Sequence, residues 1–490
     1  MNVKSVKYIL GWILKIEAAL MSLPLATALI YREREGFAFA AVMALCAACG
    51  FLLSGWRAKQ PSFYAREGFV ITALGWAVMS VFGCLPFVIT GEIPRFIDAL
   101  FETVSGFTTT GASIMPSVEE MSRCSMFWRC FTHWVGGMGV LVFLLAVLPM
   151  VGGSNMHLMK AESPGPSVGK LVPKVRQTAG LLYMLYIVMT IAQVILLLFG
   201  GMTLYQAVCT AFGTAGTGGF GFRNDSIASF SPYIQWIVTI FMILFGVNFN
   251  VYYFVLMRRF RDALCCEEMR WYLSIIAAAV LMICANIYDM SLTLEHNLRN
   301  AAFQVASIIT TTGYATVDFD LWPTFSKLIL VVLMFVGACA GSTGGGMKVS
   351  RIVMGVKSVG NYMRRCLHPR SVRRIKFEGK DVDDGTLHAI CMYFIAVFMI
   401  FVSIVLVVSL DNMDLVSTFT AVAATFNNIG PGLGMVGPTC NFSGLSDLSK
   451  AALIFGMLAG RLEVFPMLML FYPPLWREAA AVRRARRIDG

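Results

Sequence analysis

Four short glycine-containing phrases interrupt this chain, each between two long apolar segments. They are Thr109-Thr110-Gly111-Ala112, Gly216-Thr217-Gly218-Gly219, Thr311-Thr312-Gly313-Tyr314 and Asn428-Ile429-Gly430-Pro431. Small, hydroxyl and amide residues stand in these phrases, where a membrane helix would carry leucine. Backbone of this kind is tolerated at membrane depth only where it lines water or is buried in protein. We therefore expect the four phrases to meet at one axis and to form the filter of a pore.

The composition is that of a polytopic membrane protein. The 490 residues are 57% hydrophobic and only 14% charged, whereas a soluble chain carries about 25% charged residues. The net charge of +11 does not indicate nucleic-acid binding, because the basic residues lie in short stretches between apolar spans. The 13 cysteines and five histidines form no paired CxxC…CxxC motif and no HExxH motif. The sequence therefore indicates neither a metal centre nor an enzyme, and no bound organic cofactor is expected.

Each phrase follows an apolar span and a short helical segment, and it precedes another apolar span. The short segments cover residues 94–104, 204–212, 298–309 and 415–426. Crossing a bilayer takes about 20 residues, so we expect these segments to be re-entrant half-helices. The expected crossing spans are residues 8–30, 36–53, 69–89, 127–151, 180–199, 233–256, 273–287, 328–355, 390–410 and 451–471.

This order repeats along the chain, and it predicts the fold class. We expect an all-α polytopic membrane protein, with four helix–pore loop–helix repeats around a pseudo-four-fold pore and two extra N-terminal helices. The predicted units are 1–66 for the N-terminal helices, 67–175 and 176–268 for the first two repeats, 269–380 for the third repeat with a basic cytoplasmic loop, and 381–490 for the fourth repeat with a basic tail.

The basic residues between spans predict the orientation, because cytoplasmic loops carry the excess of lysine and arginine. They fall on one side of the predicted membrane: Arg57, Lys59, Arg66, Lys160, Lys170, Lys174, Arg176, Arg258, Arg259, Arg261, Arg364, Arg365, Arg370, Arg373, Arg374, Lys376, Arg483, Arg484, Arg486 and Arg487. Both termini are then cytoplasmic, and the glycine phrases open to the outside.

The chemistry of the phrases suits a monovalent cation. Backbone carbonyls around an axis can replace the water shell of an ion, and glycine allows the unusual dihedral angles that this requires. The half-helices end near the phrases, and their dipoles favour a cation there. The phrases contain no carboxylate, which argues against calcium. Any single phrase is also compatible with an ordinary helix break, but four copies in the same context favour a filter.

The assignment of residues is undecided in two of the phrases. In the second phrase Gly216, Gly218 and Gly219 compete for the filter position, and we take Gly218. In the fourth phrase Asn427 and Asn428 replace threonines, and their amides either contact the ion or brace the loop.

Two further features lie within the apolar spans. Gly341-Ser342-Thr343-Gly344-Gly345-Gly346 predicts a broken helix, since each glycine costs a helix about 1 kcal/mol relative to alanine. The alternative is a packing seam of small residues. Arg461 lies inside the last span, where an arginine is expected to be functional. The alternative is that it neutralises a buried acid, with Glu463 two residues away. Lys348 is a weaker candidate, and Lys15 and Glu17 have no functional assignment.

The chain resembles a known family, the Trk/Ktr/HKT superfamily of potassium transporters, and within it the TrkH-type membrane subunit. The resemblance covers nearly the whole chain. It rests on the segments Phe107–Ala112, Trp134–Gly139, Ala161–Pro166, Gly341–Lys348, Asn427–Gly432 and Gly460–Glu463.

The resemblance implies potassium uptake across a bacterial inner membrane, through one four-fold pseudosymmetric pore. It implies these filter residues: Thr109, Thr110, Gly111, Thr217, Gly218, Thr311, Thr312, Gly313, Asn428, Ile429 and Gly430. A serine in the first loop goes with sodium transport in related proteins, so Gly111 favours potassium. The resemblance also assigns a gate to Gly341, Ser342, Thr343, Gly344, Gly345, Gly346 and Arg461.

The resemblance further implies a cytoplasmic nucleotide-binding partner, the TrkA-type subunit, and a homodimer. The basic stretch 364–376 is then either a docking face for that subunit or an anchor to anionic lipids. The alternative function is an ion-coupled (H⁺ or Na⁺) secondary transporter of monovalent cations, which would predict inverted repeats instead of copies in one orientation.

Overall fold

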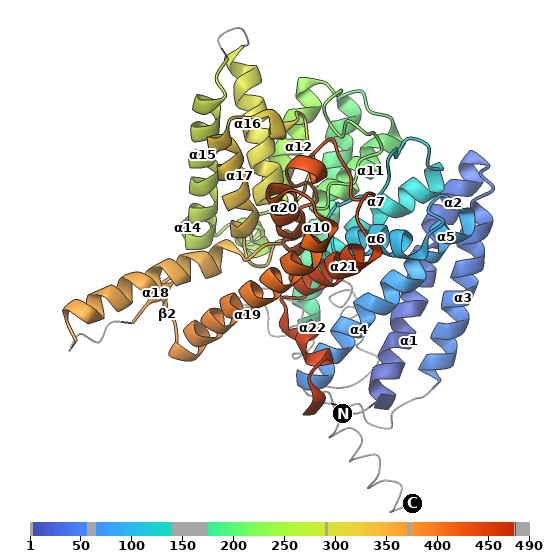
Figure 1. Cartoon of the computed structure of the whole chain (residues 1–490), viewed down its shortest axis with the longest axis horizontal. Helices are drawn as coiled ribbons and strands as arrows, with labels where there is room; N and C mark the ends of the chain where they lie inside the picture. The colour runs from blue at the N-terminus through green and yellow to red at the C-terminus, as the bar shows by residue number, and fades with distance from the viewer. Residues whose placement is uncertain are drawn as a thin grey trace, which may run out of the picture.

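The computed structural model describes residues 3–55, 65–139, 175–289, 293–369, 374–474 and 476. These residues form helices and loops, with one two-stranded hairpin of β1 (Lys376–Phe377) and β2 (Lys380–Asp381). Figure 1 shows most helices gathered in one body, from which α18 (Val349–Leu367) and the first part of α19 (Asp384–Val408) project to one side. The predicted all-helical membrane fold is confirmed.

The two extra N-terminal spans are present. The first span consists of α1 (Val3–Leu20) and α2 (Ser22–Tyr31), and the second is α3 (Gly36–Ser54). Two glycines bring α1 and α3 together, because a Cβ on Gly50 would lie 2.9 Å from the carbonyl oxygen of Gly11. Close backbone approach at small residues is the usual way in which membrane helices associate.

The four predicted half-helices are confirmed. They are α6 (Phe96–Phe107), α11 (Leu204–Ala215), α16 (Leu294–Ile309) and α20 (Leu415–Phe426). Polar side chains cap the first backbone amides of three of them: Thr203 for α11, Thr293 for α16 and Asp414 for α20. Hydrogen bonds from Ser417 lower the pKa of the Asp414 carboxyl group, which keeps this cap charged.

The half-helices and the helices that follow them form a closed ring. The following helices are α7 (Arg123–Gly137), α12 (Pro232–Phe245), α17 (Thr324–Val336) and α21 (Asp447–Arg461). Contacts run in order from α6 to α7, α11, α12, α16, α17, α20 and α21, and from α21 back to α6. This order is what four repeats around one axis predict.

The helices that precede the half-helices are long. They are α4 (Ala65–Gly83) with its continuation α5 (Leu85–Thr90), α10 (Val175–Phe199), α15 (Glu267–Asn286) and α19. Together with the N-terminal spans they make six helices, within the described ranges, that are long and apolar enough to cross a membrane.

Two of the predicted crossing spans that follow the glycine phrases are broken into two helices each, in addition to the break expected at 341–346. The predicted span 233–256 bends by 92° between α12 and α13 (Phe249–Leu256), because Asn248 caps the first turn of α13. The span 451–471 breaks between α21 and α22 (Phe465–Leu470), where Glu463 and Val464 have positive φ. The helix α7 ends at Gly137, and the rest of its predicted span lies outside the described residues.

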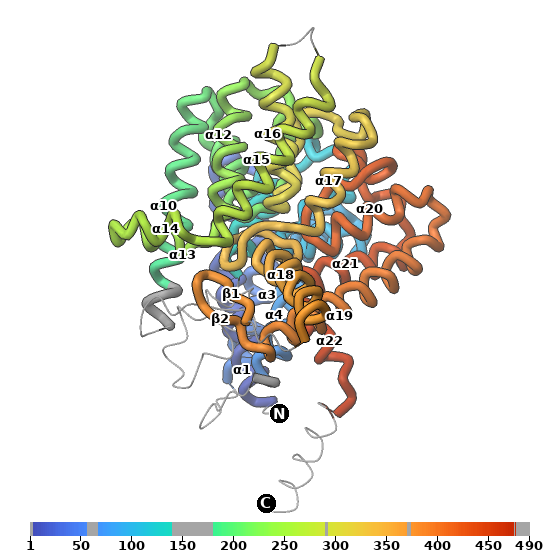
Figure 2. Tube along the Cα trace, turned by 90° about the vertical axis from the view of Figure 1, so that its left-hand side faces the viewer, coloured from blue at the N-terminus to red at the C-terminus, as the bar shows by residue number. Residues whose placement is uncertain are grey.

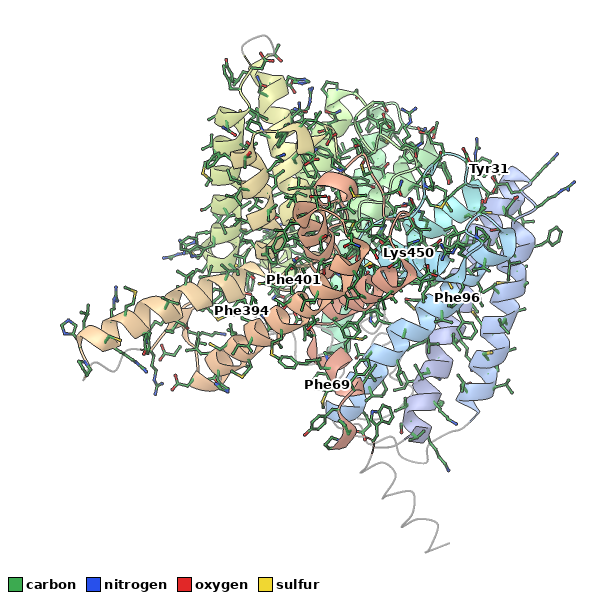
Figure 3. All side chains as sticks on the ribbon, viewed as in Figure 1. Tyr31, Phe69, Phe96, Phe394, Phe401 and Lys450 are labelled. Atoms are coloured by element: carbon green, nitrogen blue, oxygen red, sulfur yellow. The ribbon has the colours of Figure 1, made fainter. Side chains whose placement is uncertain are left out.

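Aromatic clusters and buried ion pairs hold the ring together. Phe401 of α19 packs against Phe335, Phe419 and Phe426, with ring centroids 5.3 to 6.3 Å apart. Lys450 of α21 donates to Asp98 of α6 at 2.6 Å and so joins the last repeat to the first. Figure 3 shows Phe401 and Lys450 in the interior of the helical body.

The close approach of α1 to α3 gives a stability prediction. We expect Gly50→Val to lower the free energy of unfolding by about 1–3 kcal/mol, because the added atoms overlap the backbone of α1. The measurement is thermal unfolding of the purified protein in detergent. Gly55→Ala is the matched control, since a Cβ there meets its nearest atom at 3.6 Å. Equal melting temperatures for the two variants would show that α1 and α3 separate freely.

Candidate ion pathway

The four glycine phrases have the same backbone conformation. Thr109, Thr217, Thr311 and Asn428 have φ between 54° and 58°. Two residues later, Gly111, Gly219, Gly313 and Gly430 have φ between 78° and 101°. Left-handed φ is uncommon for residues other than glycine, so its recurrence at the same position in four segments marks one shared loop structure.

The same hydrogen bond fixes each loop to the end of its half-helix. The amide of the residue before each glycine donates to a carbonyl five residues back, at 2.8 Å in all four cases. The pairs are Thr110 to Ser105, Gly218 to Gly213, Thr312 to Ser307 and Ile429 to Ala424. Each half-helix therefore delivers its negative dipole end to the loop that follows it.

The four glycines face the next loop around the ring. A Cβ on Gly111 would overlap the carbonyl oxygen of Gly218, one on Gly219 that of Thr312, and one on Gly313 that of Ile429. The ring closes because a Cβ on Gly430 would lie 2.9 Å from the carbonyl oxygen of Thr110. The structure thus brings all four predicted phrases together, with a main-chain oxygen of each loop facing the glycine of its neighbour.

The predicted register of the second loop is wrong by one residue. Gly219, and not Gly218, occupies the position of Gly111 and Gly313. Gly218 corresponds to Thr110, and it lacks a side chain because the imidazole of His133 fills that place. The repeated spacing Thr-x-Gly in the first three phrases, with Thr217 as its second copy, was the signal that would have given the correct register.

The side chains behind the loops differ between repeats. Thr108 and Thr110 join through their hydroxyl groups at 2.8 Å, and Thr310 and Thr312 do the same. The amide nitrogen of Asn428 donates to the hydroxyl of Thr110 at 2.9 Å and to the carbonyl of Met457 at 3.0 Å. The amide of Asn428 therefore braces the loop, which was one of the two roles expected for it.

A buried ion pair that the sequence interpretation missed holds the outer part of the first loop. Arg129 of α7 lies 2.6 Å from Glu102 of α6. Glu102 also accepts from the amide of Ile114 at 2.9 Å, and Arg129 donates to the carbonyl of Gly221 at 3.0 Å. Charged residues within apolar segments are the signal that would have found them. Arg129 and the four glycines line an outer cavity of about 130 Å³.

The glycine-rich segment is a loop directly beneath the filter. It joins α17 to α18, so the broken-helix prediction is confirmed over the packing seam. The amide of Gly345 donates to the hydroxyl of Thr311 at 2.6 Å, and a Cβ on Gly344 would lie 3.0 Å from the carbonyl oxygen of Thr310. We call residues 337–348 the gate loop. Positive φ at Gly337, Gly341 and Gly346 shows why glycine is needed at these three positions, and Lys348 at the end of the loop also has positive φ.

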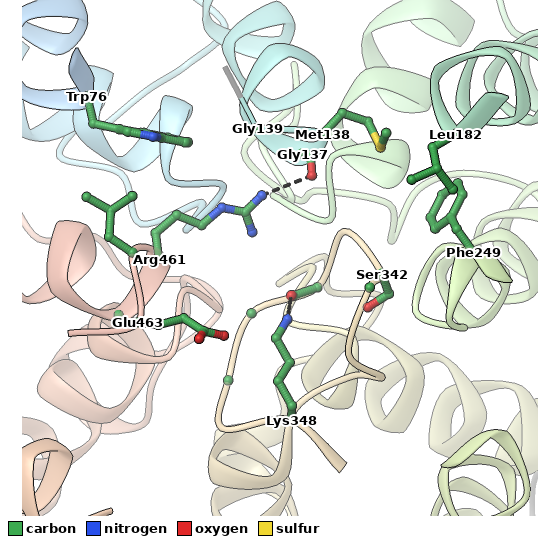
Figure 4. Close-up of a pocket in the computed structure, with 16 residues that line it drawn as sticks. Trp76, Gly137, Met138, Gly139, Leu182, Phe249, Ser342, Lys348, Arg461 and Glu463 are labelled. Carbon is green, nitrogen blue, oxygen red and sulfur yellow. Dashed lines mark hydrogen bonds between the residues drawn. The ribbon is translucent and has the colours of Figure 1, made fainter. Parts of the chain in front are cut away.

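Arg461 joins the gate loop to α7. It donates to the carbonyls of Thr343 at 2.9 Å, Gly136 at 2.6 Å and Gly137 at 3.0 Å. Figure 4 shows the bond from Arg461 to Gly137. Glu463, the acid that the alternative interpretation offered to it, pairs instead with Arg351 at 2.6 Å. Arg461 thus holds backbone carbonyls below the filter.

The sequence made Lys348 a weaker candidate, but in the structure its side chain lies against the gate loop. Its buried ammonium group donates to the carbonyl of Gly344 inside the gate loop. The gate loop, Arg461, Lys348 and Glu463 line an inner cavity of about 110 Å³ (Figure 4). Arg461 and Lys348 therefore line a cavity separate from the one that Arg129 and the four glycines line.

Some predicted features lie outside the described residues. They include the segment Ala161–Pro166, the backbone of the basic residues Arg57, Lys59, Lys160, Lys170, Lys174, Arg370, Arg373, Arg483, Arg484, Arg486 and Arg487, and the side chains of Arg66 and Arg176.

Known proteins match this chain over nearly its whole length, both in sequence and in structure. The family model TrkH, described as a cation transport protein, matches residues 35–276 and 269–477. The chain is 36% identical over 495 aligned residues to proteins named Trk system potassium uptake protein TrkH from Salmonella typhimurium and from Escherichia coli K12, covering 98% of this chain and 100% of each relative. The crystal structure of the potassium transporter TrkH from Vibrio parahaemolyticus superposes with a TM-score of 0.87 at 33% identity, covering 97% of this chain and 100% of that one.

The shared loop conformation gives a prediction for the second phrase. We expect Gly219→Ser to lower cation flux through the purified protein in liposomes, because its side chain would overlap the carbonyl oxygen of Thr312. Gly221→Ser is the matched control on the same loop, where a Cβ meets its nearest atom at 3.5 Å. Flux of wild-type size through a folded Gly219→Ser variant would contradict the assigned register.

Proposed function

Because the chain belongs to the TrkH family of cation transport proteins, we propose that it takes up potassium through the four-loop filter. The observation that carries this function is the closed ring of four glycine phrases. The glycine of each phrase faces a main-chain oxygen of the next phrase, at the ends of four half-helices. Such a site replaces the water shell of a monovalent cation with neutral oxygen dipoles.

The filter residues have separate roles in this proposal. The carbonyl groups of Thr109, Thr110, Thr217, Gly218, Thr311, Thr312, Asn428 and Ile429 offer oxygen to the ion. The glycines Gly111, Gly219, Gly313 and Gly430 allow the loops to approach each other. Threonine hydroxyls and the Asn428 amide hold the loops from behind. The half-helix dipoles add negative potential without a full charge, which suits K⁺ better than Ca²⁺.

The gate lies below the filter. The gate loop contacts the underside of the third and fourth filter loops, and the fixed charge of Arg461 repels a cation that enters the inner cavity, which Lys348 also lines. A loop that contains four glycines among residues 341–346 moves with little steric hindrance, since glycine has few forbidden conformations. We take the arrangement in this structure as closed.

The remaining assignments are proposals of the same kind. We place the protein in the bacterial inner membrane with both termini in the cytoplasm, as the basic residues between spans predict. The projecting helix α18 carries basic residues in its last turn, which suits docking of a TrkA-type nucleotide-binding subunit. A homodimer is proposed from the family resemblance. Coupling of K⁺ to H⁺ or Na⁺ is the alternative mode of transport.

Growth and flux measurements test the function directly. We expect the wild-type gene to restore growth at low potassium to a strain that lacks its own uptake systems. We also expect purified protein in liposomes to pass K⁺ in preference to Na⁺. A reversal potential that follows the proton or sodium gradient instead of the potassium gradient would favour the coupled alternative.

The first filter glycine gives a selectivity prediction. We expect Gly111→Ser to reduce the K⁺ over Na⁺ permeability ratio by about tenfold, a change of about 1.4 kcal/mol in relative barrier height. The reason is that a side chain at this position meets the Gly218 carbonyl and displaces the ring. The measurement is the reversal potential under K⁺ and Na⁺ gradients. An unchanged ratio would remove Gly111 from the selective site.

Arg461 gives a prediction for the barrier. We expect Arg461→Ala to raise K⁺ flux in liposomes several-fold, because it removes a fixed positive charge and a hydrogen bond that holds the gate loop. Arg461→Lys keeps the charge and is the matched control, with flux closer to wild type. Equal flux through folded wild type and Arg461→Ala would rule out the barrier role.

A further inference from the structure

The first turn of α15 lies between the gate loop and the hairpin β1–β2. Its N-cap residue, Cys266, makes no side-chain capping hydrogen bond. The cap comes instead from the hairpin, where the carboxylate of Glu378 accepts from the amides of Glu267 at 3.1 Å and Glu268 at 2.9 Å. The open amides at a helix start need such an acceptor, and an anion suits the helix dipole. The helix α15 therefore depends on a residue more than 100 positions further along the chain.

The conformation of Glu378 points to a specific requirement for this side chain. Glu378 and Gly379 form the tip of the hairpin, with φ of 50° and 71°. Two-residue turns with positive φ at both positions strongly favour Asn-Gly. A glutamate is unfavourable there, but its longer side chain reaches α15. Figure 2 shows the hairpin on the same side of the molecule as α13, α14 (Phe260–Cys265) and α15.

The contact between the hairpin and α15 is reciprocal. The amide of Glu378 donates to the carboxylate of Glu267 at 3.2 Å. Lys357 of α18 pairs with the same carboxylate and donates to the carbonyl of Lys376 at 2.8 Å. The hairpin, α18 and α15 are thus fastened together around Glu267.

The next residue, Glu268, reaches the gate loop. Its side chain is buried, and one oxygen accepts from the amide of Ala340 at 2.7 Å and from that of Ser350 at 3.2 Å. Ala340 lies inside the gate loop, and Ser350 lies in the first turn of α18, just after the loop ends. The second oxygen accepts from the side chain of Asn248 at 3.2 Å. One carboxylate therefore holds the gate loop near both of its ends.

We propose that Glu268 and Glu378 are positioning residues for the gate, and that the first turn of α15 couples the hairpin to the gate loop. Glu268 holds the loop closed, and Glu378 keeps α15 where Glu268 reaches the loop. A partner that displaces the hairpin withdraws the cap, shifts the first turn of α15 and releases the loop. The proposal rests on the proposed function, because it assigns the regulation of the same gate.

The test is K⁺ flux through the full chain in liposomes without any added subunit. Glu268→Ala removes the acceptor of three hydrogen bonds. Glu378→Asn keeps the turn, which asparagine favours, but its side chain is too short to cap α15. We expect flux to rise about fivefold in each variant, as loss of hydrogen bonds made only in the closed state predicts. Asp381→Asn is the matched control on the same hairpin, since Asp381 lies 3.8 Å from exposed Arg374, and its flux should equal that of wild type.

Two further readouts separate positioning from a structural role. The K⁺ over Na⁺ reversal potential should stay unchanged in every variant, because the filter is untouched. The double variant Glu268→Ala/Glu378→Asn should match Glu268→Ala alone, because the two residues act in series. Should Glu268→Ala not fold, Glu268→Gln replaces it, with a smaller rise expected because one acceptor oxygen remains.

The outcomes decide between the two levels of the proposal. Unchanged or lower flux through folded Glu268 variants, while Arg461→Ala raises flux, would overturn the coupling and leave the proposed function standing. A double variant whose rise is the product of the single rises would overturn the series arrangement. Absence of K⁺ flux in wild type and in Arg461→Ala alike would overturn the proposed function and the coupling with it.

Discussion

The contact between each filter glycine and a carbonyl of the next loop is the constraint on which the rest of the structure depends. It requires left-handed backbone at four separate points of the chain, and each point is held by the same hydrogen bond to the end of a half-helix. The half-helices in turn need helices on both sides, which the closed ring from α6 to α21 supplies. Lipid-facing helices, aromatic clusters and buried ion pairs all serve to keep four loops at one axis.

The gate loop has a glycine-rich backbone like that of the filter loops, but a different role is proposed for it. The gate loop is also glycine-rich backbone at membrane depth, but its carbonyls are occupied by Arg461 and Lys348. In the four filter loops main-chain oxygens face the glycines of the neighbouring loops, whereas in the gate loop the carbonyls of Thr343 and Gly344 accept from Arg461 and Lys348. The breaks in α12–α13, α17–α18 and α21–α22 make room for this second layer. In the proposed function, selection and closure are therefore separate layers of the same four repeats.

Much of this could be predicted from the sequence, for identifiable physical reasons. The half-helices were predictable because each is too short to cross a membrane and each precedes a glycine phrase. The register at Gly219 was missed because Gly216, Gly218 and Gly219 stand close together, although the Thr-x-Gly spacing marks it. The fold supplies the physical reason, since the imidazole of His133 fills the place beside Gly218. The bend at Asn248 was missed because the apolar pattern continues through it. Glu268 was missed because an acid in the first turn of a helix is common, and only the fold places Ala340 and Ser350 beside it.

The closure of the ring by the last repeat has a consequence for synthesis of the protein. The bonds that complete the filter and gate join residues more than 300 positions apart: Asn428 to Thr110, Lys450 to Asp98, and Arg461 to Gly136. During translation the first loop therefore enters the membrane long before its final neighbour exists. Contacts of such long range form late and slowly. A chain that stops before residue 428 lacks the fourth loop, so the ring of glycine–carbonyl contacts stays open between Gly313 and Thr110.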